Sequence, residues 1–170
     1  MISKVFRFAF ITDSQLGMNS LAGLRGPGSD KGRLDSAIAY VNENEIDFVV
    51  FGGDQIHDAD EESTDAQLDA LEESLSALAV PYYGVIGNHE QGDPAKDWKY
   101  IERGLPVRFS LTHKNTFLVG INAPWLRGDF GEHSQREEWE SLEAEFSGVS
   151  AACQHRFVVI HWPLFNFHPN

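Results

Sequence analysis

The chain has 170 residues, and its 26 acidic and 13 basic side chains give a formal net charge of −13. A hydrophobic content of 42% and an aromatic content of 12% exclude an intrinsically disordered chain, and the length favours one domain. The acidic balance disfavours nucleic acid as the main partner, because phosphate contacts need clustered Lys and Arg. No run approaches the roughly 18 apolar residues of a membrane-spanning helix, so we expect no membrane partner.

Six segments have the composition of β-strands. In chain order they are residues 5–11, 48–51, 82–86, 107–111, 116–121 and 156–160. The first is apolar on both faces, which predicts a central strand. Helical periodicity separates several of these segments, and this alternation predicts βαβ units and a largely parallel sheet packed by helices.

Helical segments lie between the strands. Apolar side chains recur at helical spacing over residues 34–41, 68–78 and 139–146, and a shorter helix is expected over 97–103. The expected N-terminal caps are Ser29 or Asp30 for the first helix, Thr64 with Gln67 for the second, and Ser134 with Glu137 for the last.

Polar side chains follow four of the predicted strands. They are Asp13 and Gln15, then Asp54, then Asn88 and His89, and finally His161. Because ligands of open α/β sheets bind beyond the carboxyl ends of the strands, we expect these side chains at one edge of one sheet. Carboxylate, amide and imidazole donors suit divalent metals, and two metals about 3.5–4 Å apart activate a bridging water and hold a phosphoryl group. His89 would then protonate the leaving oxygen.

These segments resemble the calcineurin-like metallophosphoesterase superfamily. In order, they are Asp13-Ser14-Gln15, Gly52-Gly53-Asp54, Gly87-Asn88-His89-Glu90 and His161-Trp162-Pro163-Leu164. The resemblance implies an α/β fold in which a β-sandwich is flanked by helices in an αββα order. It also implies metal-dependent hydrolysis of phosphate mono- or diesters or of phosphoproteins.

The resemblance further implies the roles of individual residues. The metal ligands would be Asp13, Gln15, Asp54, Asn88 and His161. Asp54 would bridge two divalent ions, which are Mn, Mg, Fe or Zn in the family, and His89 would be the general acid opposite a metal-bridging hydroxide. Gln15 stands where the family usually has histidine, and its neutral carbonyl favours Mn or Mg. His57 stands where the family often has Asp or Asn, so the partner that orients His89 stays open.

The family's Gly-His-x-His block, which supplies one further histidine to each metal, is missing from the sequence. The chain ends at Asn170, nine residues after His161, so each metal would be one ligand short. We therefore expect a single domain over residues 1–170 that lacks this C-terminal portion and has an incomplete second sheet. An exposed inner sheet face favours a homodimer or a segment swap that covers it.

Two functions stay open at this point. The first is a metal-dependent phosphoesterase, and the second is a truncated, metal-poor and inactive family member that acts as a binding or oligomerisation module. Trp125, Leu126 and Arg127 either pack in the core, which is favoured, or line a substrate pocket. The single cysteine, Cys153, and the lack of a signal-peptide pattern predict a cytoplasmic protein.

Overall fold

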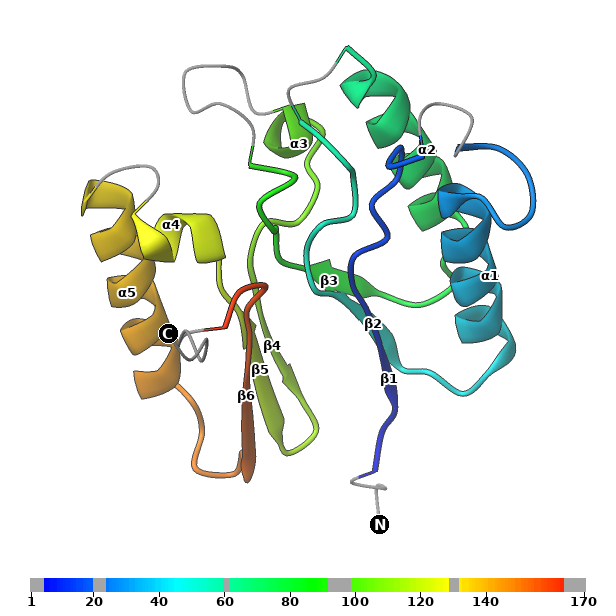
Figure 1. The fold of residues 1–170 in the computed structure, drawn as a ribbon. Helices are drawn as coiled ribbons and strands as arrows, with labels where there is room; N and C mark the ends of the chain where they lie inside the picture. The colour runs from blue at the N-terminus through cyan, green and yellow to red at the C-terminus, as the bar shows by residue number, and fades with distance from the viewer. Residues whose placement is uncertain (1–4, 20–23, 60–61, 92–98, 129–131, 164–170) are drawn as a thin grey trace, which may run out of the picture.

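The computed structural model describes residues 5–19, 24–59, 62–91, 99–128 and 132–163, without the side chains of residues 132–134. Over these residues, two three-stranded sheets face each other, and helices cover the outer face of each sheet (Figure 1). The αββα sandwich expected from the sequence is thereby confirmed. Two predictions fall partly outside the described residues: the cap that involves the side chain of Ser134, and the first residues of the helix predicted over 97–103.

The first sheet is parallel and has the order β1 (Phe8–Ile11), β2 (Phe48–Phe51), β3 (Tyr82–Gly84). The central strand is β2, whose four residues are all buried. The prediction that the first strand is central was wrong, because β1 lies at an edge of the sheet as far as the described residues form it, and Phe10 is 53% exposed. Phe8 and Phe10 point to the same side as Phe48, toward the second sheet, but the described part of that sheet leaves them partly uncovered. A run of apolar residues indicates that a strand is buried, but it does not show which other elements cover the strand.

Two helices cover the outer face of the first sheet, α1 (Asp30–Glu43) and α2 (Thr64–Ser76). The sequence left Ser29 or Asp30 open as the N-cap of α1, and the cap is Ser29, whose Oγ accepts a hydrogen bond from the Gly32 N–H at 2.9 Å. The capping box predicted for α2 was wrong. The N-cap residue there is Ser63, and the Oε1 atom of Gln67 accepts from the backbone N–H of His57 at 2.9 Å instead. The Gln67 amide therefore holds the preceding loop.

The second sheet is mixed. Its strands are β4 (Phe109–His113), β5 (Thr116–Gly120) and β6 (His155–Val159); β4 and β5 are antiparallel, and β5 and β6 are parallel. The expectation of a largely parallel arrangement thus holds for the first sheet only. Lys114 adopts a positive φ of 54° in the turn between β4 and β5, and such a turn reverses the chain. Lys114 is not one of the residues that usually mark this turn, so the sequence did not reveal the hairpin.

The remaining helices are α3 (Lys99–Glu102), α4 (Ala123–Arg127) and α5 (Glu132–Ser147). The sequence did not predict α4, which is one turn long and begins after the N-cap Asn122. In Figure 1, α4 and α5 lie beside the second sheet, on the opposite side of the molecule from α1 and α2. None of the helices in the described ranges combines the length and the apolar composition needed to cross a membrane.

Three apolar layers hold the sandwich together. Val49 and Phe51 of β2 pack against α1 and α2, whereas Phe48 and Val50 pack against the second sheet. The third layer lies between the second sheet and the helices α4 and α5, and Phe117 and Val119 of β5 contribute to it. Because β2 lies between two layers, its carboxyl end is fixed from both sides. Asp54 follows that end.

Candidate metal centre

The candidate site lies where the two sheets meet. Its residues follow four strands: Asp13 follows β1, Asp54 follows β2, Asn88 and His89 follow β3, and His161 follows β6. The expectation of one edge of one sheet was therefore wrong, because β6 belongs to the second sheet. The pattern of a strand does not tell which sheet it joins, so this seam was not visible in the sequence.

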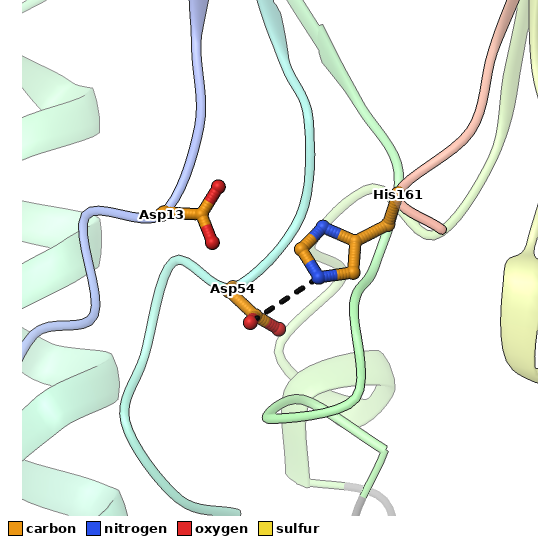
Figure 2. A group of neighbouring side chains, drawn as sticks. All are labelled: Asp13, Asp54 and His161. Carbon is orange, nitrogen blue, oxygen red and sulfur yellow. Dashed lines mark ion pairs between the residues drawn. The ribbon is translucent and has the colours of Figure 1, made fainter. Parts of the chain in front are cut away.

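Asp13, Asp54 and His161 face one another at this seam (Figure 2). One ligand atom of each side chain lies within 4.8 Å of the others. His161 Nε2 lies 3.2 Å from Asp54 Oδ2, and Asp54 is only 4% exposed. The other ring nitrogen of His161, Nδ1, lies 2.9 Å from the backbone carbonyl of Gly52. This contact fixes the ring with Nε2 toward the carboxylates, as is typical of a metal-binding histidine.

The Asp54 and His161 side chains favour each other's charged forms. The hydrogen bond to Asp54 raises the pKa of His161 to about 9, against a smaller lowering by burial. Burial would raise the pKa of Asp54, but the hydrogen bonds from His161 and from the backbone N–H of His89 lower it below its usual value. The pair therefore holds a proton that a divalent cation would replace. Two carboxylates and one imidazole form a suitable donor set for such a cation.

Gln15 and Asn88 lie beside this group with their amides held by neighbours. The Nε2 atom of Gln15 donates to Asp54 Oδ2 at 3.5 Å, so its amide nitrogen faces the carboxylate. The Oδ1 atom of Asn88 accepts a hydrogen bond from Trp162 Nε1 at 3.1 Å. Each of the two amides thus has a defined hydrogen-bond partner.

The backbone at the site adopts an uncommon conformation. Among the described non-glycine residues, positive φ angles occur at Asp13 (56°), Gln15 (41°), Asp54 (54°) and Lys114. Three of these four are candidate ligands, and such sparsely populated conformations cluster at functional sites. Backbone hydrogen bonds hold them in place, from the Asp13 N–H to the Gly53 carbonyl at 3.0 Å and from the Gln15 N–H to the Asp54 carbonyl at 2.9 Å.

Glu90 is a structural residue of the site to which sequence reasoning gave no role. Its buried carboxylate accepts hydrogen bonds from backbone N–H groups of two loops. The donors are Asp54 at 2.9 Å, Gln55, Ile56 at 3.1 Å and Gly87 at 2.7 Å. Burial raises the pKa of Glu90 to about 7, although the N–H groups oppose this rise. The available signal was the position of Glu90 in the Gly-Asn-His-Glu block.

His89 is oriented by a backbone group. Its Nδ1 atom contacts the backbone carbonyl of His57, and the two imidazole rings stack with their centroids 5.4 Å apart. The other nitrogen, Nε2, lies 3.9 Å from Asp54 Oδ2 and so faces the candidate centre. The orienting partner that the sequence left open is therefore the His57 carbonyl.

A helix-flanked β-sandwich with a carboxylate and imidazole cluster at the sheet seam is the architecture of metal-dependent phosphoesterases. The family model described as calcineurin-like phosphoesterase matches residues 6–159, so the chain belongs to this family. Comparison with curated proteins gave no match.

Two solved structures illustrate the fold. A dimetal phosphatase from Danio rerio is 18% identical with a TM-score of 0.64, and the match covers 95% of this chain and 71% of that one. GAP50, described as the anchor in the inner membrane complex of Plasmodium, is 15% identical with a TM-score of 0.63, and the match covers 95% of this chain and 56% of that one. The chain therefore spans only part of the length of either protein. At these identities the likeness concerns the fold.

Proposed function

We propose that the chain binds two divalent metal ions and hydrolyses phosphate mono- or diesters. The observation that carries this proposal is the convergence of Asp13, Asp54 and His161, with ligand atoms within 4.8 Å of one another at the seam of the two sheets. The side chains follow three different strands, and two of the residues, Asp13 and Asp54, adopt the uncommon positive φ. The packing of the apolar core requires neither this group of three side chains nor the uncommon backbone conformations.

The proposed ligands are Asp13, Gln15, Asp54, Asn88 and His161. When bound, such ions supply an activated water and neutralise the charge of the phosphoryl group. Asn88 Oδ1 retains a second lone pair beside its bond from Trp162, and Gln15 presents its oxygen after rotation of the amide. The two neutral amide oxygens favour Mn or Mg over Zn.

His89 is the proposed general acid. The His57 carbonyl accepts from Nδ1–H and thereby leaves Nε2 directed at the centre. In the protonated ring, Nε2–H donates its proton to the leaving oxygen of the ester. The reaction then leaves His89 neutral, and solvent restores its proton.

A second candidate is a binding module without catalytic activity. It is favoured by the Gln15 amide nitrogen, which faces Asp54 where a ligand oxygen is needed, and by the exposed aromatic residues Phe10 and Phe157. GAP50, which shares the fold, is described as an anchor. A structural role of that kind is the corresponding proposal for this chain.

One experiment separates the two candidates. The purified chain is loaded with Mn²⁺, its metal content is measured by mass spectrometry, and hydrolysis of p-nitrophenyl phosphate is followed. For His89→Ala we expect unchanged metal content and a kcat lowered by about 10²–10⁴-fold, as for loss of a general acid. His155→Ala, at an exposed position of β6, is the matched control and should keep full activity. Absence of both metal and turnover in the parent chain would leave the binding module.

A further inference from the structure

A pocket of about 280 Å³ opens between α4, α5 and the segment that follows β6. Its walls include Leu126, Arg127, Gln135, Trp139, Ile160 and Trp162. Most of these side chains present apolar surface, which distinguishes the pocket from the carboxylates and imidazoles of the metal centre. The volume is close to the lower end of roughly 300–1,000 Å³ for ligand sites, so it accommodates one ring-sized group.

Trp162 joins this pocket to the metal centre. Its indole ring lines the pocket, and its Nε1–H donates to Asn88 Oδ1 at 3.1 Å. Trp162 also follows His161 directly, and the two rings lie 6.2 Å apart between centroids. Trp162 therefore borders both the pocket and the candidate centre.

Two tryptophans, Trp139 and Trp162, contribute to the walls of the pocket. The Arg127 guanidinium lies 4.2 Å from the centroid of the Trp162 ring and holds the indole in position. Trp139 is 46% exposed although it lies on a helix that packs against the sheet. A tryptophan left half exposed beside a pocket offers contact area at little entropic cost.

We propose that this pocket binds the organic group of the substrate, and that this group is a flat apolar ring, as in an aryl phosphate. The inference rests on the proposed phosphoesterase function. Stacking against Trp139 and Trp162 selects the ring, and the hydrogen bond from Trp162 to Asn88 Oδ1 joins the pocket wall to a residue of the candidate centre. Small polar alkyl phosphates have no group that fills this space.

The kinetic test compares an aryl ester with an alkyl ester. For Trp139→Ala we expect KM for p-nitrophenyl phosphate to rise about tenfold, because the ring of the substrate loses one aromatic contact and the area buried in it. KM for glycerol phosphate, which has no ring, should change less than about twofold. Tyr40→Ala is the matched control, because Tyr40 is 63% exposed on α1, across the molecule from α5 (Figure 1). Equal effects on both esters, or no effect on either, would overturn the pocket assignment.

A binding measurement separates failure of the pocket from failure of the enzyme. Saturation-transfer NMR detects p-nitrophenol on the metal-free chain, where no turnover occurs. We expect a signal for the parent and for Tyr40→Ala, and about a tenfold weaker affinity for Trp139→Ala. Binding of this kind without metal-dependent hydrolysis would support the pocket and overturn the phosphoesterase proposal. Hydrolysis without p-nitrophenol binding would do the reverse.

Discussion

Glu90 connects the loops that carry Asp54 and Asn88 through a single buried carboxylate. Each of its two oxygens accepts from two backbone N–H groups, one of them from Gly87 at 2.7 Å. A buried N–H without an acceptor costs about 1–3 kcal/mol, so the carboxylate stabilises the loops more than an ordinary side-chain hydrogen bond does. Glu90 therefore positions the two loops that carry the proposed ligands Asp54 and Asn88.

Glu90→Gln tests this positioning role. The amide NH₂ would face backbone N–H donors in place of one carboxylate oxygen, and we expect the free energy of unfolding to fall by about 3 kcal/mol. Urea denaturation of the metal-free chain measures this change. Glu43→Gln, at an exposed position near the end of α1, is the control and should stay within about 0.5 kcal/mol. An equally small change in the free energy of unfolding for Glu90→Gln would show that the two loops keep their positions without the Glu90 carboxylate.

The pair of His161 and Asp54 predicts a pH dependence for the metal-free chain. The pKa of His161 is raised to about 9 in the folded state from 6.5, so its stabilising contribution is complete below pH 6.5 and is lost as pH rises through 9. The pKa of Glu90, raised from 4.5 to about 7, acts in the same direction at lower pH. In EDTA we therefore expect Tm to fall between about pH 6 and pH 9.

Metal should reverse this trend. A ligand histidine is neutral, so binding of Mn²⁺ requires His161 to release its proton, and metal affinity rises with pH in the same range. Thermal unfolding with and without Mn²⁺ at both ends of the range measures both effects. His161→Asn should flatten both dependences, which separates this pair from the general repulsion of a chain with a net charge of −13. An unchanged slope in the variant would assign the pH dependence to other groups.

At the level of elements, the loop after β3 approaches the loop after β2 so closely that only glycine fits at position 87. A Cβ atom on Gly87 would collide with the Asp54 carboxylate and lie 2.8 Å from His161 Cδ2. The close approach places Asn88 and His89 beside the carboxylates. The same contact explains why glycine precedes these two residues.

Gly87→Ala should therefore separate the two loops. We expect a loss of about 1–3 kcal/mol in the free energy of unfolding, as for overpacking elsewhere, together with weaker Mn²⁺ binding by calorimetry. Gly148→Ala is the matched control, because a Cβ there meets its nearest atoms at ordinary distances of 3.5 and 3.6 Å. Its free energy of unfolding should change by less than about 0.5 kcal/mol. Normal metal binding by Gly87→Ala would contradict the required close approach.

The sequence predicted elements well where one local pattern determines the outcome. The four apolar residues of β2 predicted the strand correctly, and Ser29 was one of the two N-caps that the sequence offered for α1. The same reasoning failed at β1, because an apolar strand can lie at an edge, and at Gln67, whose amide contacts a preceding loop. Which partner an element or side chain finds depends on the tertiary structure.

The site shows the same division. Asp13, Asp54 and His161 were identified from their positions after strands, and the structure brings them together. Two contacts were not identified: the hydrogen bonds by which Glu90 joins two loops, and the orientation of His89 by the His57 carbonyl. Both involve backbone groups, which every residue carries. Likewise, the sequence placed the candidate ligands on one sheet, because it did not show that β6 joins the second sheet.

On the scale of the whole molecule, the sandwich has an open side. Among the described residues, β1 pairs only with β2 and β6 only with β5, so each has one unpaired edge. Phe10 is 53% exposed and Phe157 is 49% exposed, although both lie on sheet faces that point into the sandwich. Unpaired edges with exposed aromatic residues favour association through β-strands.

We propose that a second copy of the chain covers this open side. Light scattering coupled to size-exclusion chromatography should then show a dimer at micromolar concentration, and Phe10→Lys should make it monomeric, because a charge on an edge strand opposes pairing. Tyr40→Lys, on the exposed surface of α1, controls for the added charge. Each copy carries a net charge of −13, so added salt should strengthen the dimer by screening the repulsion between copies. A parent chain that stays monomeric at both low and high salt would contradict this proposal.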